Sequence, residues 1–316
     1  MLKNVVKKNP YLVLAFASLC WSGNHIVGRA IVGHFPPLTI STIRWVIPAI
    51  ILWIVARAKI EQDWPIIREH WVIMFWLGAT GGILFSALQY VGLQYTSATN
   101  VSILNSLVPV LIIAAGALIF RDRILLVQLL GILTSLIGVF VIVTRGSFNA
   151  LWQLGFNYGD IIIVINMVVF AIYATYLRLR PKIHWTSFLF VLAIVSALGT
   201  MPFALFEIAS GRMPELSAGT IAAALYVSIF PSLLAFAAWN RGVELIGANR
   251  SGPFLHLVPL YTAFLASIFL GERLMIYHAL GLFMILIGVW IASRGNARKS
   301  LTRDLAAKRT SRSDIC

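Results

Sequence analysis

The sequence predicts an all-α polytopic membrane protein with ten transmembrane helices, arranged as two inverted-topology repeats of five helices each. Three observations predict this class: an apolar composition, ten apolar runs long enough to span a bilayer, and an internal repeat. Of the 316 residues, 59% are hydrophobic and only 11% are charged, and the mean hydropathy is +0.88. Because soluble proteins carry roughly 25% charged residues, the composition disfavours a soluble enzyme or a DNA-binding domain.

Ten runs of mainly apolar residues account for nearly the whole chain. A helix needs about 20 such residues to cross the hydrocarbon core. The first run follows three lysines, as a signal peptide would, but it continues to Ala30 and is interpreted as a spanning helix. The connections at 94–97 and 121–123 are short, so the helices that they join should run antiparallel. The runs cover residues 11–32, 38–56, 71–93, 98–120, 125–144, 160–179, 185–208, 219–240, 251–270 and 276–292.

The lysines and arginines orient these runs. With the N-terminus inside, most basic residues fall on the inner side, an asymmetry of about five to one. The outer side holds only Arg29, Arg145, Arg212 and Arg273. We therefore expect both termini in the cytoplasm. The net charge of +14 is then explained by the cytoplasmic membrane surface, and we expect no nucleic-acid partner.

Residues 150 positions apart match through two consecutive runs. Each half holds five runs, an odd number, so the halves should insert with opposite orientations. Inverted repeats are typical of alternating-access transporters, whose substrate site lies near the midplane where the repeats meet. The expected organisation is a tail at 1–10, repeats at 11–145 and 159–294, and a basic cytoplasmic tail at 295–316. The matched positions include Gly92 with Gly242, Leu107-Val108-Pro109 with Leu257-Val258-Pro259, Gly131 with Gly281, and Gly138 with Gly288.

Four motifs add information beyond hydropathy: Leu19 to Asn24, Leu38 to Trp45, Tyr95 to Pro109, and Leu270 to Leu274 followed by Gly281 and Gly288. Together they resemble the drug/metabolite transporter superfamily, specifically its ten-helix exporters with two EamA-type halves. Phe120 to Arg123 departs from the pattern by carrying Arg for Gly and Asp for Glu. The chain looks closest to the bacterial aromatic amino acid exporters. This resemblance implies export of amino acids across a bacterial inner (plasma) membrane.

The first run places Trp21, Asn24, His25 and Gly28 on one helical face. Polar side chains in hydrocarbon should face the interior of the bundle. We hypothesise that Trp21 supplies an aromatic wall while Asn24 and His25 hydrogen-bond a substrate. The alternative is that they bond neighbouring helices, and the small Gly28 also suggests close helix packing.

Arg44 is the one basic residue placed well inside a run, roughly 9 Å along the helix axis from Leu38. Two roles are open: its side chain reaches the outer interface, or it binds a substrate carboxylate through two parallel hydrogen bonds. No acidic residue lies in the middle of a run, since Asp160, Glu207 and Glu244 are near the ends. Carriers of organic cations usually need a membrane carboxylate, so a neutral, zwitterionic or anionic substrate is favoured.

The remaining candidates come from the repeat and from the aromatic residues. Ser106 and His256 occupy equivalent positions, although a histidine that only packs in the core is the alternative for His256. Membrane aromatic residues are mostly belt or packing residues, yet buried ones would suit a flat apolar group. The additional substrate-binding candidates are Phe85, Asn105, Ser106, Tyr173, Trp239 and His256.

Pro109 and Pro259 lie in the middle of matched runs. Proline removes an intrahelical hydrogen bond and bends a helix. We predict that the two prolines act as hinges, and a static kink is the alternative.

These patterns together predict a transporter that exports amino acids, aromatic ones favoured, and related metabolites by alternating access. Multidrug efflux of organic cations is the alternative within transporters, and a channel is a second class. An intramembrane enzyme is disfavoured because neither paired carboxylates nor a nucleophile constellation is present. The two cysteines, Cys20 and Cys316, form no metal or disulfide pattern. We expect a monomer in the bilayer that handles small molecules, with no cofactor and no metal.

Overall fold

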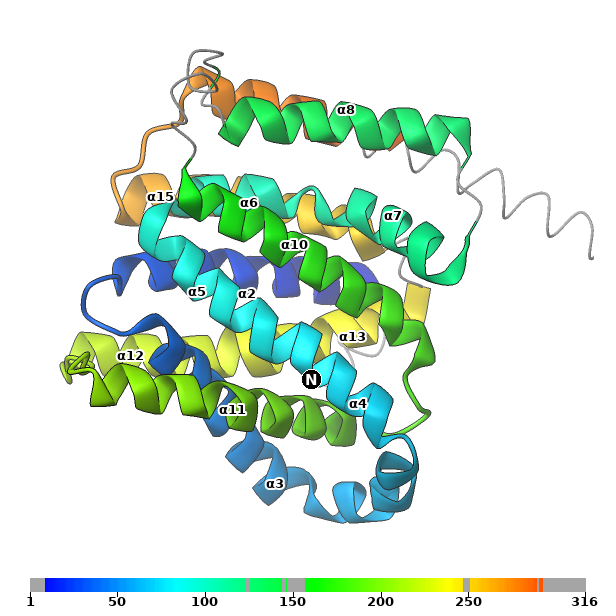
Figure 1. Ribbon diagram of the computed structural model, residues 1–316, viewed down its shortest axis with the longest axis vertical. Helices are drawn as coiled ribbons and strands as arrows, with labels where there is room; N and C mark the ends of the chain where they lie inside the picture. The colour runs from blue at the N-terminus through cyan, green and yellow to red at the C-terminus, as the bar shows by residue number, and fades with distance from the viewer. Residues whose placement is uncertain are drawn as a thin grey trace, which may run out of the picture.

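The computed structural model describes residues 9–122, 125–143, 146, 157–246, 251–288 and 290–291. Within these ranges every regular element is a helix, and the helices lie side by side in one bundle (Figure 1). The bounds are α2 Pro10–Ala30, α3 Pro37–Glu69, α4 Trp71–Gly78, η1 Ala79–Leu84, α5 Phe85–Tyr95, α6 Ala98–Asn105, α7 Val108–Phe120, α8 Leu126–Val143, α10 Tyr158–Tyr176, η2 Leu177–Leu179, α11 Trp185–Ala209, α12 Ala218–Val227, η3 Ser228–Leu234, α13 Ala235–Ile246, η4 Gly252–His256 and α15 Leu257–Phe269, followed by a helix at Ile276–Gly288.

The helix lengths fit a protein that crosses a membrane several times. Six helices are long and apolar enough to span, and the bent pair α6–α7 would make a seventh. Three shorter apolar helices cover Leu126–Ile142, Phe254–Phe269 and Ile276–Gly288. Each predicted run coincides with one of these helices, which confirms the all-helical polytopic class. The count of ten spans stays a prediction.

The helix α3 differs most from its predicted run. The predicted run at 38–56 ends at the first charges, but the helix continues to Glu69. Arg57 donates to Glu61 one turn later (2.7 Å), and Ile60 and Ile67 are buried against the bundle. Charge interrupts an apolar run without interrupting a helix, because i,i+4 ion pairs and straight-chain residues favour the helical conformation.

Two helices are broken at matched places. The axes of α6 and α7 differ by 46°, and residues 106 and 107 form tight turns whose amides reach back only three residues. In the second half, the 3₁₀ turn η4 precedes α15 at the equivalent position. Pro109 and Pro259 thus lie in the first turn of the segment after each break, where the missing N–H leaves the preceding turn without its usual bond.

Two π-helical segments also lie at matched places. The segments η1 and η3 interrupt α4–α5 and α12–α13, and they overlap when one is shifted by 150 positions. A Cβ on Gly82 would collide with the Ser196 side chain, so η1 packs too closely against α11 for a larger residue. The second segment contains Pro231, which cannot donate an α-helical bond. Such π segments are frequent at functional sites.

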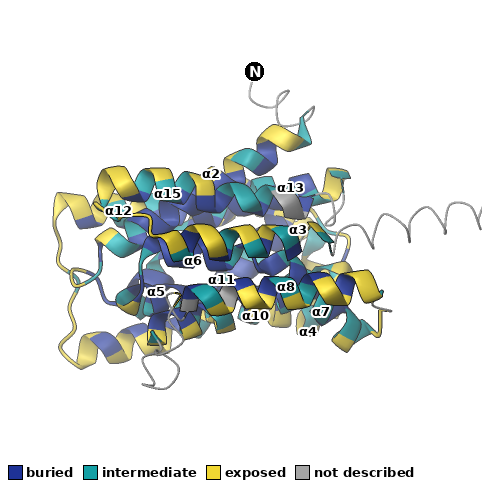
Figure 2. Ribbon diagram, turned by 90° about the horizontal axis from the view of Figure 1, so that it is seen from above, coloured by how far each residue is buried: buried dark blue, intermediate teal, exposed yellow. Residues whose placement is uncertain are grey.

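The bundle buries the inner face of each helix and exposes its outer face, as Figure 2 shows. The exposed residues are strongly apolar, for example Val55 and Leu118, with relative exposures of 79% and 84%. Large exposed aliphatic side chains are a liability in water, but they are the expected surface of a helix in lipid. The buried face instead carries the polar residues of the candidate site.

Candidate functional site

A small, partly enclosed cavity of about 30 Å³ lies among the inner faces of the helices. This volume holds about two water molecules. The breaks in the two bent helices contribute Val108, Leu255 and Val258 to its wall. The complete lining comprises Trp21, Asn24, His25, Arg44, Phe85, Asn105, Val108, Phe170, Leu255 and Val258.

The cavity brings together six of the ten substrate-binding candidates: Trp21, Asn24, His25, Arg44, Phe85 and Asn105. The other four do not line it. The Tyr173 ring packs 5.7 Å from Phe170, and the Trp239 ring packs 5.5 Å from Trp21. Ser106 and His256 lie at the two helix breaks. The structure thus separates the six lining residues from these four, and substrate binding by any of the ten stays a prediction.

Arg44 is fully buried. Its Nε donates to the Ser232 hydroxyl (2.8 Å) and its Nη1 to the Tyr90 hydroxyl (3.4 Å). The guanidinium carbon lies 5.5 Å from the ring centroids of both Trp45 and Tyr90. The alternative in which Arg44 extends to the membrane interface is wrong, because hydroxyl partners on α5 and η3 hold its head group inside the bundle.

The charge of Arg44 has no acidic counterpart among the described residues, whose ion pairs all lie elsewhere. Removing an ion from water costs several kcal/mol even after relaxation. Hydroxyl groups and aromatic faces offset only part of this cost. The site therefore has an uncompensated positive charge, which favours an anionic group in the cavity.

The polar face of α2 hydrogen-bonds its neighbours while it lines the cavity. The Tyr90 hydroxyl donates to Asn24 Oδ1 (2.8 Å), which extends the chain of contacts from Ser232 through Arg44. The Nε2 atom of His25 lies 3.1 Å from the amide nitrogen of Asn105. With the amide as donor, Nε2 accepts and Nδ1 carries the proton. The bonds to other helices predicted as the alternative are therefore present, and the binding of a substrate by this face stays a prediction.

Several buried polar atoms on or beside the residues that line the cavity have no partner in the described protein. They are His25 Nδ1, Ser106 Oγ, the Tyr173 hydroxyl and both ring nitrogens of His256. An unsatisfied buried polar group costs about 1–3 kcal/mol, and such groups are rare in folded proteins. Seven more such atoms lie on other described residues, and His25 Nδ1 is the one on a lining residue, where a solute or water in the cavity can complete its bond.

Aromatic rings form the other wall. The Phe85 and Phe170 rings lie 5.0 Å apart, and Trp21 meets Phe170 edge-on at 6.4 Å. The Trp21 indole donates to the carbonyl of Pro231 in η3 (3.2 Å), which fixes the ring. Sequence reasoning missed Phe170 and Ser232, and Pro231 in an apolar run was the one local signal of the η3 irregularity.

Among the described residues, no carboxylate lines the cavity. Asp160 accepts hydrogen bonds from Thr96 and Asn100, and Glu207 accepts them from the first amides of α3. Both acids are therefore used at helix ends, as the sequence predicts, and neither faces the candidate site.

The family follows from comparison with known sequences. The profile of the EamA-like transporter family matches residues 8–144 and again residues 157–294. The chain belongs to the EamA-like transporter family. The predicted superfamily resemblance and the transporter class are thereby confirmed, and the multi-pass membrane location agrees with both the family and the apolar helices.

Curated relatives of this transporter span nearly its whole length. It is 28% identical to the uncharacterized transporter YyaM of Bacillus subtilis over 289 residues, which covers 90% of this chain and 93% of the relative. It is 27% identical to YetK of the same organism, covering 91% and 88%, and 25% identical to an uncharacterized transporter of Archaeoglobus fulgidus, covering 90% and 96%. A solved crystal structure shares the fold with a TM-score of 0.60 at 18% identity, covering 92% of this chain and 98% of that one.

Proposed function

We propose that this transporter exports amino acids, aromatic ones favoured, and related metabolites across the bacterial inner membrane by alternating access. The observation that carries the proposal is Arg44, a fully buried cation with neutral partners at the wall of an aromatic-lined cavity. Two parallel hydrogen bonds from a guanidinium match a carboxylate. Trp21, Phe85 and Phe170 would then face a flat apolar side group.

The charge of the site also separates this proposal from multidrug efflux of organic cations. A cationic drug would have to enter a cavity whose formal charge is already positive and whose described lining holds no acid. Like charges in a low-dielectric site repel by several kcal/mol. An amino acid instead places its carboxylate at Arg44, and its ammonium group can bond neutral acceptors such as the Asn105 amide oxygen.

We further propose that residues 11–145 and 159–294 are inverted five-helix repeats, giving ten spans. The doubled family match, the paired helix breaks and the paired π segments support this proposal. The contact between α8 and Ile276–Gly288 supports it too. A Cβ on Gly138 would lie 2.7 Å from the carbonyl oxygen of Gly281. A Cβ on Gly288 would collide with the carbonyl oxygen of Gly131. Crossed pairing of equivalent glycines is the pattern expected of two helices related by a two-fold axis.

The small cavity without a nucleophile or an acid in its described lining, together with the broken helices, favours a mechanism without covalent chemistry. In an inverted-repeat carrier the halves rock around a fixed central site, and bending at Pro109 and Pro259 would open one side at a time. With the N-terminus inside, both termini are cytoplasmic. Reporter fusions at the two ends test this orientation, and opposite locations would overturn the repeat proposal.

The substrate proposal is tested with purified protein in liposomes. Labelled phenylalanine or tryptophan should equilibrate, and unlabelled amino acid on the far side should stimulate counterflow, which a channel would not show. The variant Arg44→Gln should lower apparent affinity about 100-fold, because removing one partner of a buried charge pair costs 2–5 kcal/mol. Arg44→Lys keeps the positive charge but cannot donate two parallel hydrogen bonds, so a smaller loss of apparent affinity is expected.

The control is Arg57→Gln, which removes an exposed arginine outside the cavity and should leave flux unchanged. Thermal stability of each variant separates loss of binding from loss of fold. Absence of amino-acid flux above protein-free vesicles, or transport of quaternary ammonium compounds instead, would contradict the substrate proposal.

A further inference from the structure

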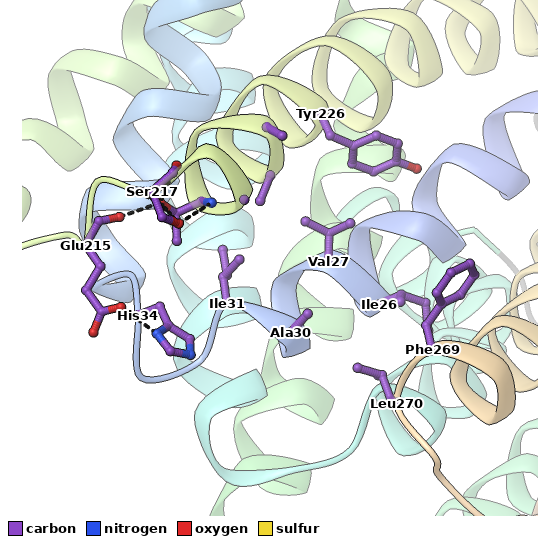
Figure 3. Close-up of a pocket in the computed structure, with 14 residues that line it drawn as sticks. Ile26, Val27, Ala30, Ile31, His34, Glu215, Ser217, Tyr226, Phe269 and Leu270 are labelled. Carbon is purple, nitrogen blue, oxygen red and sulfur yellow. Dashed lines mark hydrogen bonds and ion pairs between the residues drawn. The ribbon is translucent and has the colours of Figure 1, made fainter.

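A second and much larger cavity, of about 760 Å³, opens on the side of the bundle between α2, α12 and α15. In Figure 1, α2 lies between α15 and α12. Figure 3 shows the walls: Ile26, Val27 and Ile31 from α2 and its end, Tyr226 from α12, and Leu270 after α15. We call this space the lateral cleft.

The lateral cleft faces the lipid side of α2. Leu12, Phe16 and Leu19 form an exposed stripe along α2, with relative exposures of 56%, 41% and 45%. Farther along α2, Gly23 is buried against the Tyr226 hydroxyl, and the stripe resumes at helical spacing with Val27 and Ala30, which line the cleft. The cleft is therefore a local widening of the surface that contacts hydrocarbon, separate from the central cavity.

Most polar groups of the lateral cleft lie at one end, and the exception is the Tyr226 hydroxyl, which lies against Gly23 of α2. His34 Nδ1 pairs with Glu215 at 2.7 Å, and the Glu215 amide donates to the His34 carbonyl (2.9 Å). Ser217 and Thr220 lie beside them at the start of α12. This arrangement, with an apolar length and a polar end near the helix termini, has the polarity profile of one phospholipid: a chain below a headgroup.

The equivalent space in the other half is filled by the protein itself. The residues 150 positions from Tyr226 and Leu270 are Trp76 and Phe120, and Tyr176 at the end of α10 lies beside both. The Tyr176 ring lies 6.1 Å from Trp76 and 5.7 Å from Phe120. Arg178 covers Phe120 with its guanidinium 4.0 Å from the ring centroid. Three aromatic rings thus pack together here, whereas the cleft has the aliphatic Ile26 and Leu270 beside Tyr226.

We propose that the lateral cleft is a binding site for a phospholipid acyl chain, which fills the space that Tyr176 and Phe120 fill in the other half. An apolar cavity does not hold ordered water, and an unfilled space of this size forfeits the dispersion contacts of its whole lining. Among apolar molecules, lipid chains are the ones that surround these helices. The bound chain keeps α12 and α15 apart, with its headgroup beside His34 and Glu215. This inference does not depend on the identity of the transported substrate.

The experiment uses the full chain in vesicles of phosphatidylethanolamine and phosphatidylglycerol, with a small fraction of phosphatidylethanolamine carrying a diazirine near the middle of one acyl chain. After irradiation, adducts are mapped by mass spectrometry. We expect adducts on Ile26 and Ile31, which are buried in the protein and line the cleft. The variant Ala223→Trp fills the cleft and should lower these adducts about five-fold through lost space.

Ile221→Trp is the matched control, because Ile221 lies on the same helix, is 50% exposed and does not line the cleft. It should leave the adducts on Ile26 and Ile31 unchanged. Ala30→Trp fills the cleft from the opposite wall and replaces Ala223→Trp if that variant does not fold. Labelling of the lipid-facing Leu129 and Leu133 on α8 without adducts on the cleft residues would overturn the proposal. Equal cleft labelling in the filled variants would overturn it as well.

Discussion

At the end of the bundle where α2 is followed by α3, carboxylates accept several hydrogen bonds each from other helices. At the opposite end most of the described charged groups form exposed ion pairs, and Asp63 accepts a single, exposed hydrogen bond from the His184 amide (2.9 Å). We call these the carboxylate end and the basic end. At the carboxylate end, Glu207 accepts bonds from the first amides of α3 and from the Thr39 hydroxyl (2.8–3.2 Å). Glu272 accepts the equivalent three bonds from the start of α6 (2.5–3.1 Å).

At the basic end, the contacts are of another kind. Arg178 pairs with Asp122 at 3.1 Å, and both side chains are about half exposed. Arg241 pairs with Glu244 within one helix, at 2.9 Å. Exposed pairs contribute about 0–1 kcal/mol, whereas carboxylates at helix N-termini satisfy orphan amides and interact with the helix dipole. The difference indicates that separating the helices at the carboxylate end breaks stronger hydrogen bonds than separating them at the basic end.

The largest expected effect comes from Glu207→Ala. It leaves two amides and one hydroxyl of α3 without their acceptor, so we expect a loss of about 3 kcal/mol in stability. The thermal unfolding midpoint of the purified protein in detergent measures it. Glu207→Gln keeps an acceptor oxygen and should lose less. If the alanine variant unfolds at the wild-type temperature, the proposed contribution of Glu207 is wrong.

An intermediate effect is expected from Asn100→Ala at the same end. The Asn100 amide donates to both oxygens of Asp160 (3.1 Å each), and its oxygen lies 2.8 Å from His278 Nε2. Loss of these buried bonds should cost about 2 kcal/mol. The same melting experiment tests the ranking. Its control is Gln62→Ala, which truncates an exposed amide side chain on α3 and should melt as the wild type does.

The smallest effect is expected from Arg178→Ala at the basic end, about 0–1 kcal/mol. His34→Ala sharpens the comparison, because His34 pairs with Glu215 at the carboxylate end while both side chains are more than half exposed. If burial rather than position decides the strength of these contacts, both variants should shift the melting midpoint equally little. A large shift for His34→Ala alone would mean that location matters more than burial.

Hydropathy predicts the helices well because the cost of burying each residue in lipid is nearly additive along the chain. Helical periodicity also places Trp21, Asn24 and His25 on one inward face, as the structure has them. The prediction is wrong at the end of α3, where the charges end only the apolar part and the helix continues. Pro109 follows the bend between α6 and α7 and Pro259 follows the 3₁₀ turn η4, so each proline marks an irregular helix because the missing N–H is a property of the residue itself, while their action as hinges stays a prediction.

The sequence alone establishes the family and the apolar segments. It also establishes that no acidic residue lies in the middle of an apolar segment, since all three are local or compositional properties. Packing between helices selects which polar groups meet. Ser232 reaches Arg44 across 188 residues, and Phe170 completes the aromatic wall, because both contacts depend on how several helices come together. The lateral cleft likewise arises from packing: side-chain volumes on three helices set the space, and no single helix carries a signal of it.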